Sequence, residues 1–149
     1  MTNLGNTVLH DGRLAEAETA YREALPMASK FFGDQSTDVA AVLSGLADIA
    51  RQRGRLAESE TMAREALKIR EQRLGPDHAD TADSLVLLGR ALVESGRLSE
   101  AEAPLLRAVM VLDAQKGLET RRREAREAVV RLYERWGRRE EAARFRVPS

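Results

Sequence analysis

Gly54-Arg55-Leu56-Ala57-Glu58-Ser59-Glu60 defines the architecture of this chain, because the chain repeats its pattern at a fixed interval. The pattern Gly-Arg-Leu-x-Glu-x-Glu occurs 42 residues to either side, and a looser copy follows near the end of the chain; the copies start at Gly12, Gly96 and Gly137. A second glycine series has the same 42-residue step and consists of Gly33, Gly75 and Gly117. Two interleaved glycine series with one period indicate a repeat protein.

The segments between the glycines have the apolar spacing of α-helices. Between Thr37 and Arg53 the large apolar side chains lie three and four residues apart, as on one face of a helix; they are Val39, Val42, Leu43, Leu46 and Ile49. The segment Leu56–Leu74 continues this pattern, and so does the third repeat with Leu85, Leu88, Leu92, Leu98, Leu105, Val109 and Leu112. No stretch alternates apolar with polar residues as a strand would, and six aromatic residues are few for a sheet. The sequence therefore predicts an all-α fold.

The turns predict how these helices are arranged. Gly54 and Gly96 follow expected helix ends, where glycine adopts a positive φ without a steric penalty. The short Gly-Arg-Leu turn makes the two helices of a unit antiparallel. Small residues lie where helices would cross closely, at Ala47, Ala66, Gly89 and Ala108. Because one helix pair cannot bury its apolar faces alone, the units are expected to stack into a solenoid.

The repeat divides the chain into four units of a single domain, residues 1–149. We expect a truncated first repeat at 1–33, complete repeats at 34–75 and 76–117, and a short C-terminal capping repeat at 118–149. The first repeat is truncated because Leu4 and Gly5 already occupy mid-helix register positions.

Composition excludes several classes of function. The 24 basic and 24 acidic residues balance, so no net field favours nucleic acid or an anionic membrane. The absence of cysteine excludes disulfides and thiolate metal sites. No signal peptide or membrane-length apolar run is visible, so a cytoplasmic protein is expected. The 21 arginines against 3 lysines suggest a bacterial origin.

These motifs resemble the 42-residue tetratricopeptide repeat variant of kinesin light chains and many bacterial proteins. The resemblance is carried by Leu74-Gly75-Pro76-Asp77-His78 between units, by Leu46-Ala47 and Leu88-Gly89, and by the Gly-Arg-Leu motif. It implies a right-handed solenoid of helix pairs that is a scaffold for protein–protein interaction. The closing stretch 132–145 is similar to the end of repeat regions that follow bacterial serine/threonine kinase domains. The alternative is therefore a self-associating, spacer or regulatory region of a larger signalling protein.

Enzymatic chemistry has little support in the sequence. His10 and Asp11 are adjacent, and neighbours do not face one another on a helix, so His10 is interpreted as a helix-end residue. His78 with Asp77 and Asp80 resembles a metal cluster, but a helix cap is the preferred interpretation. We expect no enzyme activity, no metal and no cofactor.

The resemblance places the first helix of each unit on the concave face. The repeat register then predicts a mixed polar groove for an extended peptide or a partner helix. Its residues are Asn6, His10, Ser44, Asp48, Arg51, Val86, Arg90, Val93, Glu94, Glu127, Arg131, Glu134 and Arg135. An unused, solvated face stays as the alternative.

The two ends of the chain suggest further contacts. Residues 1–117 carry a charge of −4 and residues 118–149 a charge of +4. The arginines 121–123 and 126 are interpreted as the solvated face of a capping repeat, with an acidic partner or a phosphosite as the alternative. At the other end, Leu4, Val8 and Leu9 have no preceding repeat to cover them, which suggests a homodimer.

Overall fold

The computed structural model describes the backbone of residues 4–146 and the side chains of residues 12–146. These residues form α-helices and no strand, which confirms the predicted all-α fold. None of the described helices is both long enough and apolar enough to cross a membrane. The helices are α1 (Leu4–Phe32), α2 (Thr37–Gln52), α3 (Leu56–Leu74), α4 (Ala79–Glu94), α5 (Leu98–Asp113), α6 (Glu119–Arg135) and α7 (Arg139–Phe145).

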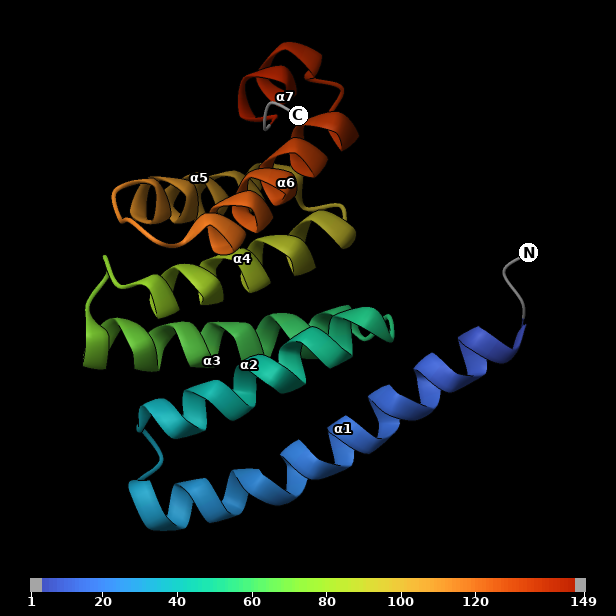
Figure 1. The fold of residues 1–149 in the computed structure, drawn as a ribbon, viewed down its shortest axis with the longest axis vertical. Helices are drawn as coiled ribbons and strands as arrows, with labels where there is room; N and C mark the ends of the chain where they lie inside the picture. Colours follow the sequence, from blue (N-terminus) through green and yellow to red (C-terminus); the bar gives the residue numbers. More distant parts are fainter. Residues whose placement is uncertain (1–3, 147–149) are drawn as a thin grey trace.

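The helices stack in chain order from α1 at one end to α7 at the other (Figure 1). Each helix packs against the next, and α4 also approaches both α2 and α6. The even-numbered helices therefore line one face of the stack, with α3 and α5 behind them. This is the predicted solenoid of antiparallel helix pairs.

Glycines end most of the helices, as the two series predicted. Gly54 and Gly96 have φ values of 79° and 81°, a left-handed conformation that a residue with a Cβ rarely adopts. The start of α2 is fixed by Ser36, whose Oγ accepts a hydrogen bond from the Val39 backbone N–H at 3.2 Å. Local sequence therefore sets the length of each unit.

The expected turn at Gly12 is wrong. α1 continues through it as one helix of 29 residues, and Gly12 is absent from the positive-φ glycines. A turn needs a first helix that buries enough apolar surface against the second to offset the lost hydrogen bonds. Only residues 4–11 of α1 precede Gly12, about half the length of the 16-residue α2 and α4. The helix therefore stays straight, and its N-terminal half projects from the stack (Figure 1).

Small side chains allow the close helix packing of the core. Ala47, Ala66 and Ala108 are fully buried, as the sequence predicted. Ser59 is also buried, and its Oγ donates a hydrogen bond to the Ala47 carbonyl at 2.7 Å, which joins α3 to α2. The larger core cluster extends from α2 to α7, and a smaller one joins α1 to α2 and α3.

The Gly-Arg-Leu-x-Glu-x-Glu motif also links each repeat to the next. The last glutamate of one copy reaches the arginine of the following copy: Glu18 pairs with Arg55 at 2.6 Å, and Glu60 pairs with Arg97. Hydrogen bonds from Arg55 and Arg22 lower the pKa of Glu18 to about 2. These ion pairs position the stacked units while the apolar core supplies most of the stability.

Candidate functional site

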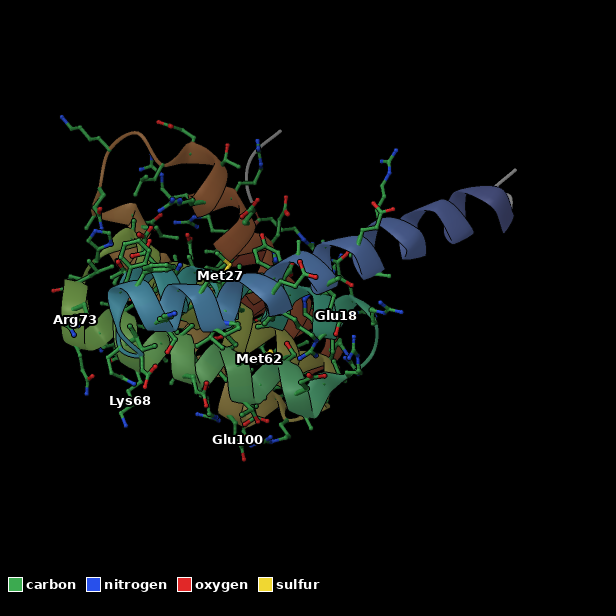
Figure 2. All side chains as sticks on the ribbon, turned by 90° about the horizontal axis from the view of Figure 1, so that it is seen from below. Glu18, Met27, Met62, Lys68, Arg73 and Glu100 are labelled. Atoms are coloured by element: carbon green, nitrogen blue, oxygen red, sulfur yellow. The ribbon has the colours of Figure 1, made fainter. Side chains whose placement is uncertain are left out.

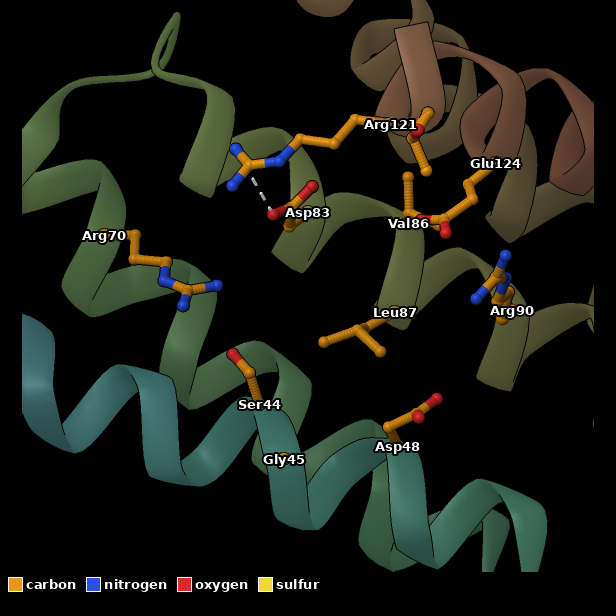
Figure 3. Close-up of a pocket in the computed structure, with 11 residues that line it drawn as sticks. Ser44, Gly45, Asp48, Arg70, Asp83, Val86, Leu87, Arg90, Arg121 and Glu124 are labelled. Carbon is orange, nitrogen blue, oxygen red and sulfur yellow. Dashed lines mark ion pairs between the residues drawn. The ribbon is translucent and has the colours of Figure 1, made fainter. Parts of the chain in front are cut away.

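The inner face of the stack contains an open hollow of about 630 Å³ where α2, α4 and α6 meet (Figure 3). Figure 3 shows apolar Leu87 near its centre, with charged side chains of both signs around it. The hollow includes four of the predicted groove residues, Ser44, Asp48, Val86 and Arg90. The other residues that line it are Gly45, Arg70, Asp83, Leu87, Thr120, Arg121 and Glu124.

Asp48, Arg51 and Glu94 form a charged network beside this hollow. The Arg51 guanidinium lies 2.9 Å from the Asp48 carboxylate and 3.0 Å from the Glu94 carboxylate, so it joins α2 to α4. Burial disfavours the charged form of Arg51, but the two carboxylates outweigh it and raise its pKa. The Arg51 Nε is buried without a hydrogen-bond partner among the described residues.

Arg70 lines the hollow from α3 and is a residue that the sequence analysis missed. Its Nη1 donates hydrogen bonds to the Asp80 carbonyl at 3.2 Å and to the Ser84 Oγ at 3.0 Å. Burial lowers its pKa, although the nearby carboxylates of Asp80 and Asp83 oppose this shift. In the repeat register Arg70 corresponds to Leu112, a fully buried residue. A charged residue at a core register position is the signal that could have identified it.

The opposite wall of the hollow is built around Arg121 and Asp83. The Arg121 Nη1 lies 3.2 Å from the Asp80 carboxylate and 3.6 Å from the Asp83 carboxylate. Burial raises the pKa of Asp83, and the positive charges of Arg121 and Arg70 oppose that rise. Arg122 and Arg126 also pair with acidic residues of this chain, Glu119 and Asp113. Most of the expected arginine cluster is therefore neutralised within the fold.

The fourth unit places its groove residues around a second hollow, of about 600 Å³. Glu127, Arg131 and Glu134 line it together with Phe145. Arg135 lies elsewhere: its Nη1 donates a hydrogen bond to the Val93 carbonyl at 2.7 Å.

Three predicted groove residues are not part of an observed open surface. One of them is buried, and the side chains of the other two are not described by the structure. Val93 is 4% exposed and belongs to the core. Asn6 and His10 fall on α1, in the part of the chain whose side chains the structure does not describe. The hollow is therefore centred on α2 and α4 rather than on the whole predicted strip.

The helix-cap interpretation of His78 is confirmed. It is the N-cap of α4, and its Nδ1 accepts a hydrogen bond from the Asp80 backbone N–H at 3.0 Å. Among residues 12–146 no three His, Asp or Glu side chains are grouped so that they could hold a metal ion. The arrangement of the hollow instead suits ion pairs and hydrogen bonds around a small apolar centre.

Comparisons with known proteins point to one family and one fold. A family model described as tetratricopeptide repeat matches residues 1–72 and 38–114. A search of curated proteins finds no match. The crystal structure of BtubC (BKLC) from P. vanneervenii is similar, with a TM-score of 0.80 and 21% identity over 90% of this chain. A putative kinesin light chain with nearly identical TPR-like repeats, from Podosopora anserina, has a TM-score of 0.78 and 20% identity over 95% of this chain.

The matched structures are longer than this chain. The chain spans 54% of the BtubC structure and 68% of the Podosopora anserina structure. At about 20% identity the likeness concerns the fold of the repeats.

Proposed function

The chain belongs to the tetratricopeptide repeat family, and we propose that it is a non-catalytic interaction module that binds a peptide or a partner helix along α2, α4 and α6. Tetratricopeptide repeats generally mediate contacts between proteins. The observation that carries the proposal is the hollow, in which three repeats contribute charged groups around Leu87 and Val86.

The charges of the hollow support a polypeptide ligand with charged side chains. Arg70 and Arg90 have no carboxylate within 4.0 Å among the described residues, whereas Arg121 is paired with Asp80. Asp48, Asp83 and Glu124 contribute negative charge to the same hollow. A ligand can therefore form ion pairs with both signs, and this fixes its direction and register.

Charge reversal in the groove tests this proposal. Peptides are selected from a random display library on the wild-type chain and then titrated against the double variant Arg90→Glu/Arg131→Glu. Binding is expected to weaken about tenfold or more, because each reversal sets like charges against the ligand. Fluorescence anisotropy of the labelled peptide gives the dissociation constants.

The matched control is Arg107→Glu/Arg144→Glu, which changes the net charge equally at exposed residues of α5 and α7. It is expected to bind the peptides like the wild type. If both double variants bind equally well, the groove is idle and the chain is better described as a spacer or regulatory region.

A further inference from the structure

One side of α5 carries an apolar strip opposite to its buried face. Residues three and four apart share one face of a helix, and the members of this strip are Ala103, Leu106, Met110 and Ala114. They line an open hollow of about 830 Å³, and Met110 is 72% exposed beside it. The fully buried residues of α5, Leu105 and Leu112 among them, lie on the other side of the helix and belong to the core.

The preceding repeat shows that the stack does not require apolar residues at these positions. Forty-two residues earlier, α3 has exposed polar or charged residues at the same four register positions; they are Thr61, Arg64, Lys68 and Gln72. In Figure 2 the Lys68 side chain extends outwards from the stack. With these polar residues in place, α3 packs against both α2 and α4. The apolar strip of α5 therefore indicates a contact outside the chain.

Two opposite charges lie on the same flank of the strip. Arg107 and Asp77 line the hollow, and among residues 12–146 neither forms an ion pair within 4.0 Å. Arg107, Val111 and Gln115 follow one another at four-residue steps along this flank of the helix. The Gln115 Nε2 donates a hydrogen bond to the Asp77 carbonyl at 3.0 Å, so Asp77 lies on the flank that Arg107 occupies, nearer the C-terminal end of α5.

We propose that two copies of this chain associate through these strips, with their α5 helices antiparallel about a two-fold axis near Met110. Such an axis reverses the direction of the helix and keeps each flank on its own side, so the two Arg107 flanks meet. Arg107 lies three residues before Met110, and Gln115, which bonds Asp77, lies five residues after it. The rotation therefore brings Arg107 to within about 3 Å, along the helix direction, of the partner's Asp77. The long arginine side chain covers this offset, and two ion pairs form at the edge of the buried apolar strips.

The proposed contact lies behind the groove on α2, α4 and α6. It also differs from the N-terminal contact suggested by Leu4, Val8 and Leu9, whose side chains lie outside the described part of the chain. The groove variant Arg90→Glu/Arg131→Glu is therefore expected to dimerise like the wild type. A loss of the dimer in that variant would place the contact in the groove and overturn the proposal.

Charge reversal at the two exposed residues tests the two-fold pairing. Sedimentation equilibrium of the wild-type chain at concentrations up to about 1 mM is expected to show a monomer–dimer equilibrium. Arg107→Glu and Asp77→Arg each set like charges against one another in both ion pairs, so each is expected to raise the dimer dissociation constant about tenfold or more. An equal mixture of the two variants is expected to form a heterodimer, because both ion pairs are then restored. A mixture that associates no better than the separate variants would overturn the pairing, and a monomeric wild type would overturn the second copy as the occupant of the strip.

A single engineered cysteine tests the position of the axis. The chain has no cysteine, so Met110→Cys places one thiol near the axis, opposite the same residue of the partner. Mild oxidation is expected to give a covalent dimer on a non-reducing gel, and reductant should reverse it. The matched control is Lys68→Cys, at the same register position of α3 and also exposed, which is expected to form far less covalent dimer. Equal dimer formation by both variants would mean random collision and would contradict the proposal.

Discussion

Gly89→Leu is expected to destabilise the chain by about 3 kcal/mol or more, a large part of the free energy of unfolding of a domain of this size. A Cβ at this position would lie 2.3 Å from the Leu105 Cδ2 and 2.4 Å from its Cγ. Leu105 is fully buried, so its side chain has no free space to move into. The two helices of the third repeat must therefore separate or lose their packing. Urea denaturation followed by circular dichroism measures the loss.

The control adds a leucine where there is room. Ala57→Leu changes an exposed residue of α3 and is expected to alter the free energy of unfolding by less than about 0.5 kcal/mol. Adding Leu105→Ala to Gly89→Leu should recover part of the lost stability, because it opens the space that the new side chain needs. If Gly89→Leu unfolds at the same urea concentration as Ala57→Leu, this result contradicts the close packing of α4 on α5.

Alkaline pH is expected to destabilise the C-terminal end through Tyr133. Burial, followed by the hydrogen bond that its hydroxyl donates to the Glu102 Oε2 at 2.7 Å, raises the pKa of Tyr133 from 10.0 to about 12. The folded state thus favours the neutral phenol. This stability is fully present below pH 10 and is lost as the pH rises towards 12. Because Tyr133 is only 3% exposed, the shift of two pKa units corresponds to about 2–3 kcal/mol of folding stability.

Two variants isolate this effect. Tyr21→Phe leaves Tyr133 as the single tyrosine, so the ultraviolet absorbance of the tyrosinate follows its titration directly. Tyr133→Phe should lose about 1 kcal/mol at neutral pH, because the Glu102 hydrogen bond is removed. It should also show a smaller loss of stability between pH 10 and 12 than the wild type. Equal losses in both proteins would contradict the assigned role of Tyr133.

Most of the fold is predictable because its signals are local. The apolar spacing and the glycines predict α3 at Leu56–Leu74, which are its observed bounds, and the prediction for α2 differs by one residue. At the C-terminal end Tyr133 is buried, and Trp136 packs against the same cluster. Helix spacing and capping depend on neighbours within a few residues, and a single sequence displays them directly.

The errors arise where the outcome depends on a distant partner. Gly12 has the same local motif as Gly54, yet the chain does not turn there, and α1 runs through it as one helix. The repeat register places Val93 in the groove, but its side chain is buried. Arg70 belongs to α3, behind the groove, but its long side chain reaches the hollow between α2 and α4. Helical periodicity predicts faces and does not predict how far a side chain extends.

Nuclear magnetic resonance shows directly whether the inner face of the stack binds a polypeptide. A peptide selected on the wild-type chain is titrated into the isotope-labelled protein, and the backbone amide shifts are followed. The largest shifts are expected at Ser44, Asp48, Leu87 and Arg90, which line the hollow. Shifts concentrated instead on α3 and α5, behind the groove, would contradict binding by the inner face.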